Sequence, residues 1–147
     1  MSLIPESKLS GRTIEKIEKI VGAANVSIKE TDRAAYSRDL WPLGQIWMMH
    51  LDIPHPPDAV VWVGNEEQIS ALLRLANEEK FPVIPFAAGS GVCGGTLPIA
   101  GGVVMDVKKM NRILATACPT CERTFHRADQ KLAVSDVITL VAERLEE

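Results

Sequence analysis

The sequence predicts an α+β fold organised around one βαβ unit. Residues 59–63 form a nearly continuous β-branched run, which is typical of a strand covered on both faces. Residues 65–76 carry apolar side chains at helical spacing. Two further apolar runs follow at residues 81–85 and 103–107. The order strand, helix, strand predicts a small mixed sheet with flanking helices.

A helix and a short strand are expected before this unit. Residues 13–21 place isoleucines and a valine at helical spacing, and Gly22 can end that helix. Residues 25–29 are predicted to form a short strand. Residues 33–39 and 41–44 show neither the helical spacing of apolar residues nor the alternation of a strand, so an irregular conformation is expected there.

The next segment, residues 46–53, is unusually apolar and has three interpretations. It can be a strand, a packed loop or an exposed patch. Three prolines at positions 54, 56 and 57 follow it and should hold the connection extended.

The helix of the βαβ unit has a clear start signal. Asn65 can cap it, and Gln68 stands three residues later in the capping-box position. The expected buried stripe consists of Ile69, Leu72, Leu73 and Ala76. Near the end of the chain, Ser135 is predicted to cap a second helix that reaches Leu145.

Residues 82–95 read PVIPFAAGSGVCGG and are the most informative stretch of the chain. Small residues let backbone N–H groups approach a ligand, and consecutive N–H groups can form an anion-binding nest. A cofactor that contains a diphosphate fits such a loop. No lysine follows the glycines as a P-loop requires. A GxGxxG can be read from Gly89 to Gly94, but Thr96 and Pro98 predict a turn where the dinucleotide fold needs a helix.

Several elements in the same order resemble a known family. They are PDAVVWV, the helix NEEQISALLRLA, the strand FPVIP, the loop FAAGSGVCGGT and the strand GGVVMDVKKMNRIL. Together with residues 36–39, they are similar to the FAD-linked oxidases related to p-cresol methylhydroxylase, vanillyl-alcohol oxidase and the glycolate oxidase flavoprotein subunit. The resemblance covers about residues 10–114. It implies the first subdomain of an FAD-binding PCMH-type domain, truncated before the second subdomain and the substrate cap.

The resemblance implies FAD as the cofactor and places its diphosphate in the glycine-rich loop. Related proteins usually have arginine and glycine where Phe86 and Ala87 stand, so this cradle is expected to be tighter or partly filled. At least one of Gly89 and Gly91 should have a positive φ. No catalytic residue is predicted, and Asp106 is expected to be solvated or to cap a turn. The cofactor-binding residues are expected to be Pro85, Phe86, Ala87, Ala88, Gly89, Ser90, Gly91, Val92, Gly94 and Gly95.

Residues 115–147 resemble something else, the tail of the cysteine-rich iron–sulfur subunits of glycolate oxidase and heterodisulfide reductase. Cys118 and Cys121 form a CxxC pair that can supply one edge of a metal site. Because such sites commonly need four ligands, iron–sulfur or zinc binding within one chain is not expected. The predicted division is a partial FAD-binding domain at 1–114 and a CxxC segment at 115–147.

Three functions follow from these observations. The first is an FAD-binding module of a flavin-dependent oxidoreductase that acts on a 2-hydroxy acid and passes electrons to an iron–sulfur partner; it is not expected to be catalytic alone. The second is an assembly or homo-oligomerisation module that uses the apolar residues 46–53. The third is a metal or thiol-redox module based on the CxxC pair.

The composition limits the classes of partner and the compartment that are expected. With 46% hydrophobic and 24% charged residues and a net charge of −3, the chain is expected to fold and not to bind polyanions. It has no basic stripe for nucleic acid and no apolar run near the roughly 18 residues of a membrane span. Three cysteines do not make a secreted disulfide framework, and the first residues lack a signal-peptide core. The cytoplasm is the expected compartment.

Overall fold

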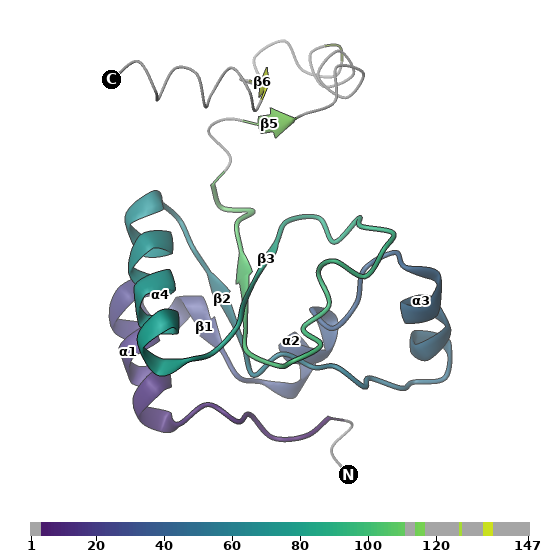
Figure 1. The fold of residues 1–147 in the computed structure, drawn as a ribbon, viewed down its shortest axis with the longest axis horizontal. Coiled ribbons are helices and arrows are strands. Elements are labelled where there is room, and N and C mark those ends of the chain that lie inside the picture. The colour runs from purple at the N-terminus through teal and green to yellow at the C-terminus, as the bar shows by residue number, and fades with distance from the viewer. Residues whose placement is uncertain (1–3, 111–113, 117–126, 128–133, 137–147) are drawn as a thin grey trace. The chain divides into compact units, whose positions relative to one another are not determined.

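The computed structural model describes residues 4–110, 114–116, 127 and 134–136. The chain divides into two compact units, Met1–Lys109 and Met110–Glu147, and each is described by itself. The elements of the first unit, in chain order, are α1 (Gly11–Val21), the 3-10 turn η1 (Ala23–Asn25), β1 (Val26–Ser27), α2 (Glu30–Ala35), α3 (Pro42–Met49), β2 (Ala59–Trp62), α4 (Glu66–Glu79), β3 (Val83–Phe86) and β4 (Val103–Asp106) (Figure 1).

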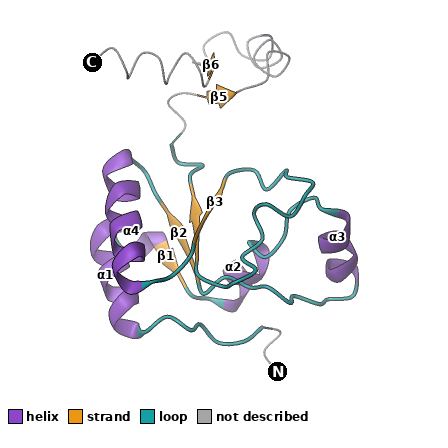
Figure 2. Ribbon diagram, in the orientation of Figure 1, coloured by secondary structure: helices purple, strands orange, loops and turns teal. Residues whose placement is uncertain are grey.

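The first unit contains a four-stranded mixed sheet in the order β1-β2-β4-β3, which confirms the predicted fold class. β1 runs antiparallel to β2, whereas β2 and β3 both run parallel to β4. Although β4 is the last of these four strands in the sequence, it lies between β2 and β3, the two strands of the βαβ unit that Figure 2 labels. Every residue of β4 is buried, as expected for a central parallel strand covered on both faces.

Helices α1 and α4 pack side by side along the sheet (Figure 1). Ile17 of α1 and Leu72 of α4 are fully buried. The predicted stripe of α4 is partly wrong, because Leu73 is 43% exposed and Leu75 is buried in its place. The interface also carries a polar link, in which Thr13 Oγ1 donates to Glu79 Oε2 at 3.1 Å.

The N-terminus of α4 is capped as expected. The Asn65 side chain accepts a hydrogen bond from the Gln68 backbone N–H at 2.9 Å. The return bond reaches one residue further back than in a standard capping box, since Gln68 Oε1 accepts from the Gly64 N–H at 2.8 Å. Both capping hydrogen bonds of α4 therefore come from residues at the start of the helix itself.

Two short helices occupy segments that were expected to be irregular. Helix α2 is held by a long-range contact, in which the buried Arg33 donates from Nε to the Pro57 carbonyl at 2.6 Å. Helix α3 begins with Pro42 in its first turn, where a proline costs no hydrogen bond. With only 6 and 8 residues, these helices are too short to show a clear apolar period.

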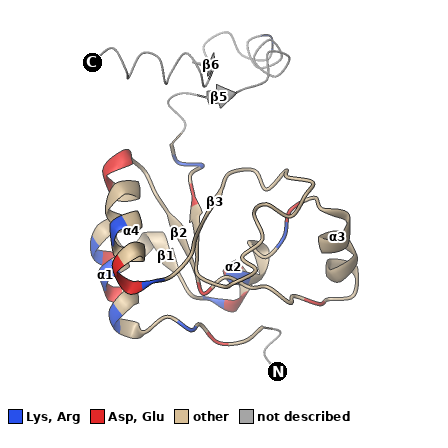
Figure 3. Ribbon diagram, in the orientation of Figure 1, with Lys and Arg blue, Asp and Glu red and all other residues tan. Residues whose placement is uncertain are grey.

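The apolar residues 46–53 do not form a strand, so that interpretation is wrong. They begin inside α3, and Ile46, Met49 and Leu51 are 51%, 82% and 73% exposed. Residues 40–51 contain no Lys, Arg, Asp or Glu, and Figure 3 shows α3 without charge while charges of both signs cover α1 and α4. The exposed-patch interpretation describes this surface.

In the second unit, β5 (Leu114–Thr116) pairs in parallel with β6 (Val134–Asp136). Ser135 lies in β6 opposite Ala115, so it does not have the helix-capping role predicted for it. Cys118, Cys121 and the remainder of the predicted C-terminal helix lie outside the described residues. Within the described part of the chain, no helix is long and apolar enough to cross a membrane.

Candidate functional site

The glycine-rich loop leaves β3 and turns sharply at Gly89, whose φ is +63°. This confirms the prediction that at least one of Gly89 and Gly91 has a positive φ. Gly91 is not among the positive-φ residues; Gly94, with a φ of +75°, provides the next such turn. Both conformations are unfavourable for residues with a Cβ. Most residues between 87 and 95 are exposed, so much of this backbone is accessible to a ligand.

Phe86 packs directly beneath the turn. Its side chain is only 8% exposed, and a Cβ placed on Gly89 would lie 2.6 Å from the ring atom Cζ. On its other side, the Phe86 ring contacts the Tyr36 ring, with 4.8 Å between the centroids. The bulk of Phe86 therefore fills the space under the loop, and only a glycine fits above it.

A second segment, residues 39–41, contacts the loop at Gly91. The Leu40 N–H donates to the Gly91 carbonyl at 2.8 Å, and Asp39 Oδ1 accepts from the Trp41 N–H at 2.9 Å. Asp39 is 2% exposed, and among the described residues its Oδ2 atom has no hydrogen-bond partner. A Cβ on Gly91 would lie 3.3 Å from this oxygen, so the loop and the carboxylate are in close contact.

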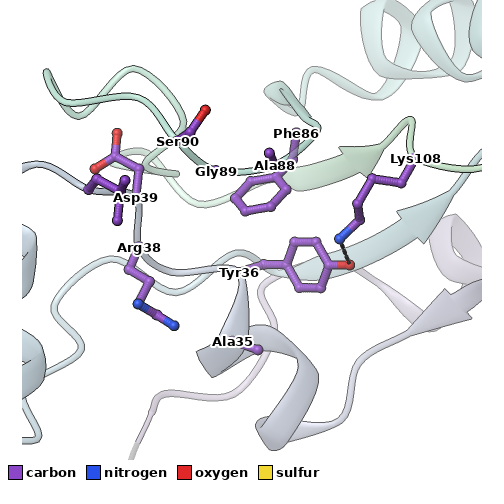
Figure 4. A pocket seen from close by; sticks show the side chains of 10 residues that line it. Ala35, Tyr36, Arg38, Asp39, Phe86, Ala88, Gly89, Ser90 and Lys108 are labelled. Atoms are coloured by element: carbon purple, nitrogen blue, oxygen red, sulfur yellow. Dashed lines mark hydrogen bonds between the residues drawn. The ribbon is translucent and has the colours of Figure 1, made fainter. Parts of the chain in front are cut away.

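An open pocket of about 350 Å³ lies between residues 35–40 and the glycine-rich loop. Residues 35, 36 and 38–40 line one side, and residues 86, 88–90 and 108 line the other (Figure 4). The pocket thus contains four of the predicted cofactor-binding residues, at positions 86 and 88–90. The other six predicted residues do not line this pocket: Pro85, Ala87, Gly91, Val92, Gly94 and Gly95.

The side of the pocket at β4 is a polar network centred on the Tyr36 hydroxyl. This hydroxyl donates to Asp106 Oδ2 and accepts from Trp62 Nε1 at 3.1 Å and Lys108 Nζ at 3.2 Å. Burial raises the pKa of the Tyr36 phenol, and the hydrogen bond to Asp106 raises it further. The hydrogen bond with Asp106 raises the pKa of the Lys108 ammonium, so it stays charged at neutral pH.

Asp106 differs from its predicted description in one respect. It is fully buried, so the expectation of a solvated carboxylate is wrong. It does cap the turn after β4, because its Oδ1 accepts from the Lys108 N–H at 2.8 Å, and its Oδ2 pairs with Lys108 Nζ at 2.9 Å. Its partner Tyr36 is 70 residues away in the sequence, which no local pattern reveals.

Sequence reasoning missed Tyr36, Arg38 and Lys108 as pocket residues. The first two belong to the segment that carries the family resemblance, so a signal existed for them. Lys108 follows the strand as one of two adjacent lysines, and nothing in the pattern separates it from Lys109, which instead donates to Asn25 Oδ1 at 2.6 Å. The described residues contain no group of three or more His, Cys, Asp or Glu side chains placed to hold a metal ion.

The pocket offers donors for an anion. Exposed backbone at the Gly89 turn offers N–H groups, and two cationic side chains, Arg38 and Lys108, line the pocket together with one carboxylate, that of Asp39. Apolar and aromatic surface from Phe86 and Tyr36 completes the lining. A ligand that combines a phosphate with ring or sugar groups matches this mixture.

Comparison with known proteins agrees with this chemistry. Residues 57–120 match the family model described as FAD binding domain. The glycolate oxidase subunit GlcD of Bacillus subtilis is 34% identical over 100 residues, which is 68% of this chain and 19% of that protein. These matches support FAD as the cofactor.

Solved structures share the fold. An alkyldihydroxyacetonephosphate synthase structure superposes with a TM-score of 0.71 over 85% of this chain and 27% of that one, at 16% identity. Substrate-bound p-cresol methylhydroxylase superposes with a TM-score of 0.56 over 74% of this chain and 20% of that one, at 25% identity. The first unit therefore has the FAD-binding PCMH-type fold. The chain spans about a fifth of the length of the glycolate oxidase subunit.

Proposed function

We propose that the first unit binds the diphosphate of FAD in the loop at residues 85–95, as part of a flavin oxidoreductase that oxidises a 2-hydroxy acid. The family match spans this loop. Glycolate is a 2-hydroxy acid, and the similarity to the glycolate oxidase subunit supports this substrate class. The division into a partial FAD-binding domain at 1–114 and a CxxC segment at 115–147 belongs to the same proposal.

The observation that carries the proposal is the backbone turn at Gly89. A positive φ at this position makes a tight turn shortly after β3, and a turn of this kind can direct neighbouring N–H groups toward one anion. Because the turn borders a pocket that Arg38 and Lys108 also line, a diphosphate bound there would meet both backbone donors and positive charge.

When bound, the flavin supplies the hydride acceptor, and the protein supplies binding and orientation. In this chain the Phe86 and Tyr36 rings give the pocket a rigid aromatic wall, and the buried Asp106 holds that wall through the Tyr36 hydroxyl. These residues would orient the dinucleotide and limit the water around it. We also propose a cytoplasmic enzyme whose electrons pass to an iron–sulfur partner, on the resemblance of residues 115–147.

A titration of the purified protein with FAD tests the proposal. We expect saturable binding with a shifted flavin absorption band and a higher melting temperature. Replacing Ser90 with aspartate places a negative charge in the exposed loop, where it would repel a diphosphate. Ser90→Asp is therefore expected to weaken FAD binding about tenfold, the equivalent of about 1.4 kcal/mol.

Ser70→Asp is the matched control, because it makes the same change on α4, away from the pocket residues. It should leave FAD affinity unchanged. A protein that shows no FAD-dependent change in spectrum or melting temperature refutes the proposed function. Equal affinity of the two aspartate variants would show that FAD binds elsewhere.

A further inference from the structure

The Lys108 side chain lies at the surface, yet its ammonium group contacts several other side chains. Its side chain is 52% exposed, yet its ammonium lies 2.9 Å from the buried Asp106 Oδ2 and 3.2 Å from the Tyr36 hydroxyl. The same ammonium lies 5.0 Å from the centroid of the Tyr36 ring and 5.6 Å from that of Phe86. Figure 4 shows it reaching over the aromatic wall toward the Tyr36 hydroxyl.

This arrangement leaves one donor available. An ammonium group has three N–H bonds, and two of them point to Asp106 and Tyr36. The ring contacts are favourable for a cation and restrict its movement further. A flexible lysine loses side-chain entropy when it binds an anion, whereas Lys108 is already ordered and would lose less.

We propose that Lys108 is a binding residue for the FAD diphosphate, contacting a phosphate oxygen across the pocket from the Gly89–Ser90 turn. This inference rests on the proposed function. Asp106 then acts as a positioning residue, because it is fully buried and pairs with the ammonium without lining the pocket, whereas Tyr36 both bonds to the ammonium and lines the pocket. The ligand chemistry that this end of the pocket selects is a phosphate anion.

A simpler account gives Lys108 only a structural role, in which it neutralises the buried Asp106. The two accounts predict different behaviour when both charges are removed together. If neutralising Asp106 is all that matters, Asp106→Asn should make Lys108→Gln harmless. If Lys108 contacts phosphate, the double variant still lacks the phosphate-binding charge.

The test measures FAD affinity for the parent, Lys108→Gln, Asp106→Asn/Lys108→Gln and the matched control Lys109→Gln. Lys109 is the adjacent lysine, whose ammonium binds Asn25 instead, so this control makes the same charge change outside the pocket. The double variant also guards against unfolding, since it leaves no unpaired buried carboxylate. Inorganic pyrophosphate serves as a competitor that carries the diphosphate without flavin or sugar.

We expect both Lys108 variants to bind FAD about tenfold or more weakly than the parent, as for loss of a hydrogen bond to a charged group. Pyrophosphate should displace FAD from the parent and from Lys109→Gln, but much less effectively from either Lys108 variant. Added salt should weaken FAD binding more in the parent than in the Lys108 variants.

Parent-like FAD affinity in the double variant would overturn the inference while leaving the proposed function intact. An equal loss of affinity in Lys108→Gln and Lys109→Gln would overturn it as well, because the effect would then be one of net charge. Failure of the parent itself to bind FAD would refute both the inference and the proposed function.

Discussion

Replacing Gly89 with alanine tests the geometry of the glycine-rich loop directly. An alanine at a φ of +63° is strained by about 1–2 kcal/mol, because its Cβ crowds the backbone. The same Cβ would lie 2.6 Å from the Phe86 ring, and such overpacking typically costs about 1–3 kcal/mol. The ring cannot swing away freely, since it is buried against Tyr36.

Together these terms predict that Gly89→Ala lowers the free energy of unfolding by about 2–5 kcal/mol. That is a large part of the total for a small domain, which is about 5–15 kcal/mol. Urea denaturation followed by circular dichroism measures the change. The control is Gly95→Ala in the same loop, where a Cβ meets no atom within 4 Å and no positive φ is needed, so little change is expected.

A double-mutant cycle separates the two terms. In a Phe86→Leu background the steric part of the Gly89→Ala cost should fall, and the backbone part of about 1–2 kcal/mol should remain. Equal stabilities of Gly89→Ala and Gly95→Ala would refute the reasoning. Gly91 does not have a positive φ, so a substitution there lacks the backbone part of this cost. At Gly91 the obstacle is the Asp39 carboxylate 3.3 Å away.

Three further predictions concern stability. Gly102→Ala should be more damaging than Gly89→Ala in thermal unfolding, because Gly102 has a φ of +87° and its new Cβ would lie 2.4 Å from the Pro82 carbonyl oxygen, which is held in the sheet by a hydrogen bond from the Val103 N–H. A smaller loss than for Gly89→Ala would contradict this. Tyr36→Phe should cost about 1–3 kcal/mol in urea unfolding, since Asp106 loses a buried donor. The folded-state pKa of Tyr36 is raised, so the difference in free energy of unfolding between the parent and Tyr36→Phe depends on pH. It should be constant below about pH 10, the usual tyrosine pKa, and decline as the pH rises further toward the folded-state pKa. A difference that grows with pH would contradict this. Asn65→Ala should remove the α4 cap at a cost of about 1 kcal/mol, and an unchanged urea midpoint would show that the hydrogen bond from Gln68 does not contribute.

Features set by neighbouring residues were predictable from the sequence. The β-branched run of β2, the Asn65 cap and the turn at Gly89 each depend on residues within a few positions. The strand β2 depends on the packing of β-branched side chains, the Asn65 cap on an unpaired N–H group at the helix start, and the Gly89 turn on the absence of a Cβ. The helix α4 could be placed for the same reason. Its buried face could not be set fully, because the choice of Leu75 over Leu73 depends on how α4 packs against the rest of the unit.

The short helices α2 and α3 were not predictable in this way. A helix of one or two turns gains little from its own hydrogen bonds, so distant contacts decide whether it forms. For α2 the contact is the bond from Arg33 to the Pro57 carbonyl, across 24 residues. The sequence of α2 does not reveal this partner.

The sequence by itself therefore determined the fold class and the glycine-rich turn after β3, because these depend on local backbone preferences and on a short ordered set of motifs. Only the tertiary structure decided that Asp106 is buried, that Tyr36 bonds to it and that Lys108, rather than Lys109, lines the pocket. The physical reason is distance along the chain: Tyr36 and Asp106 are 70 residues apart, and only the folded chain brings them together.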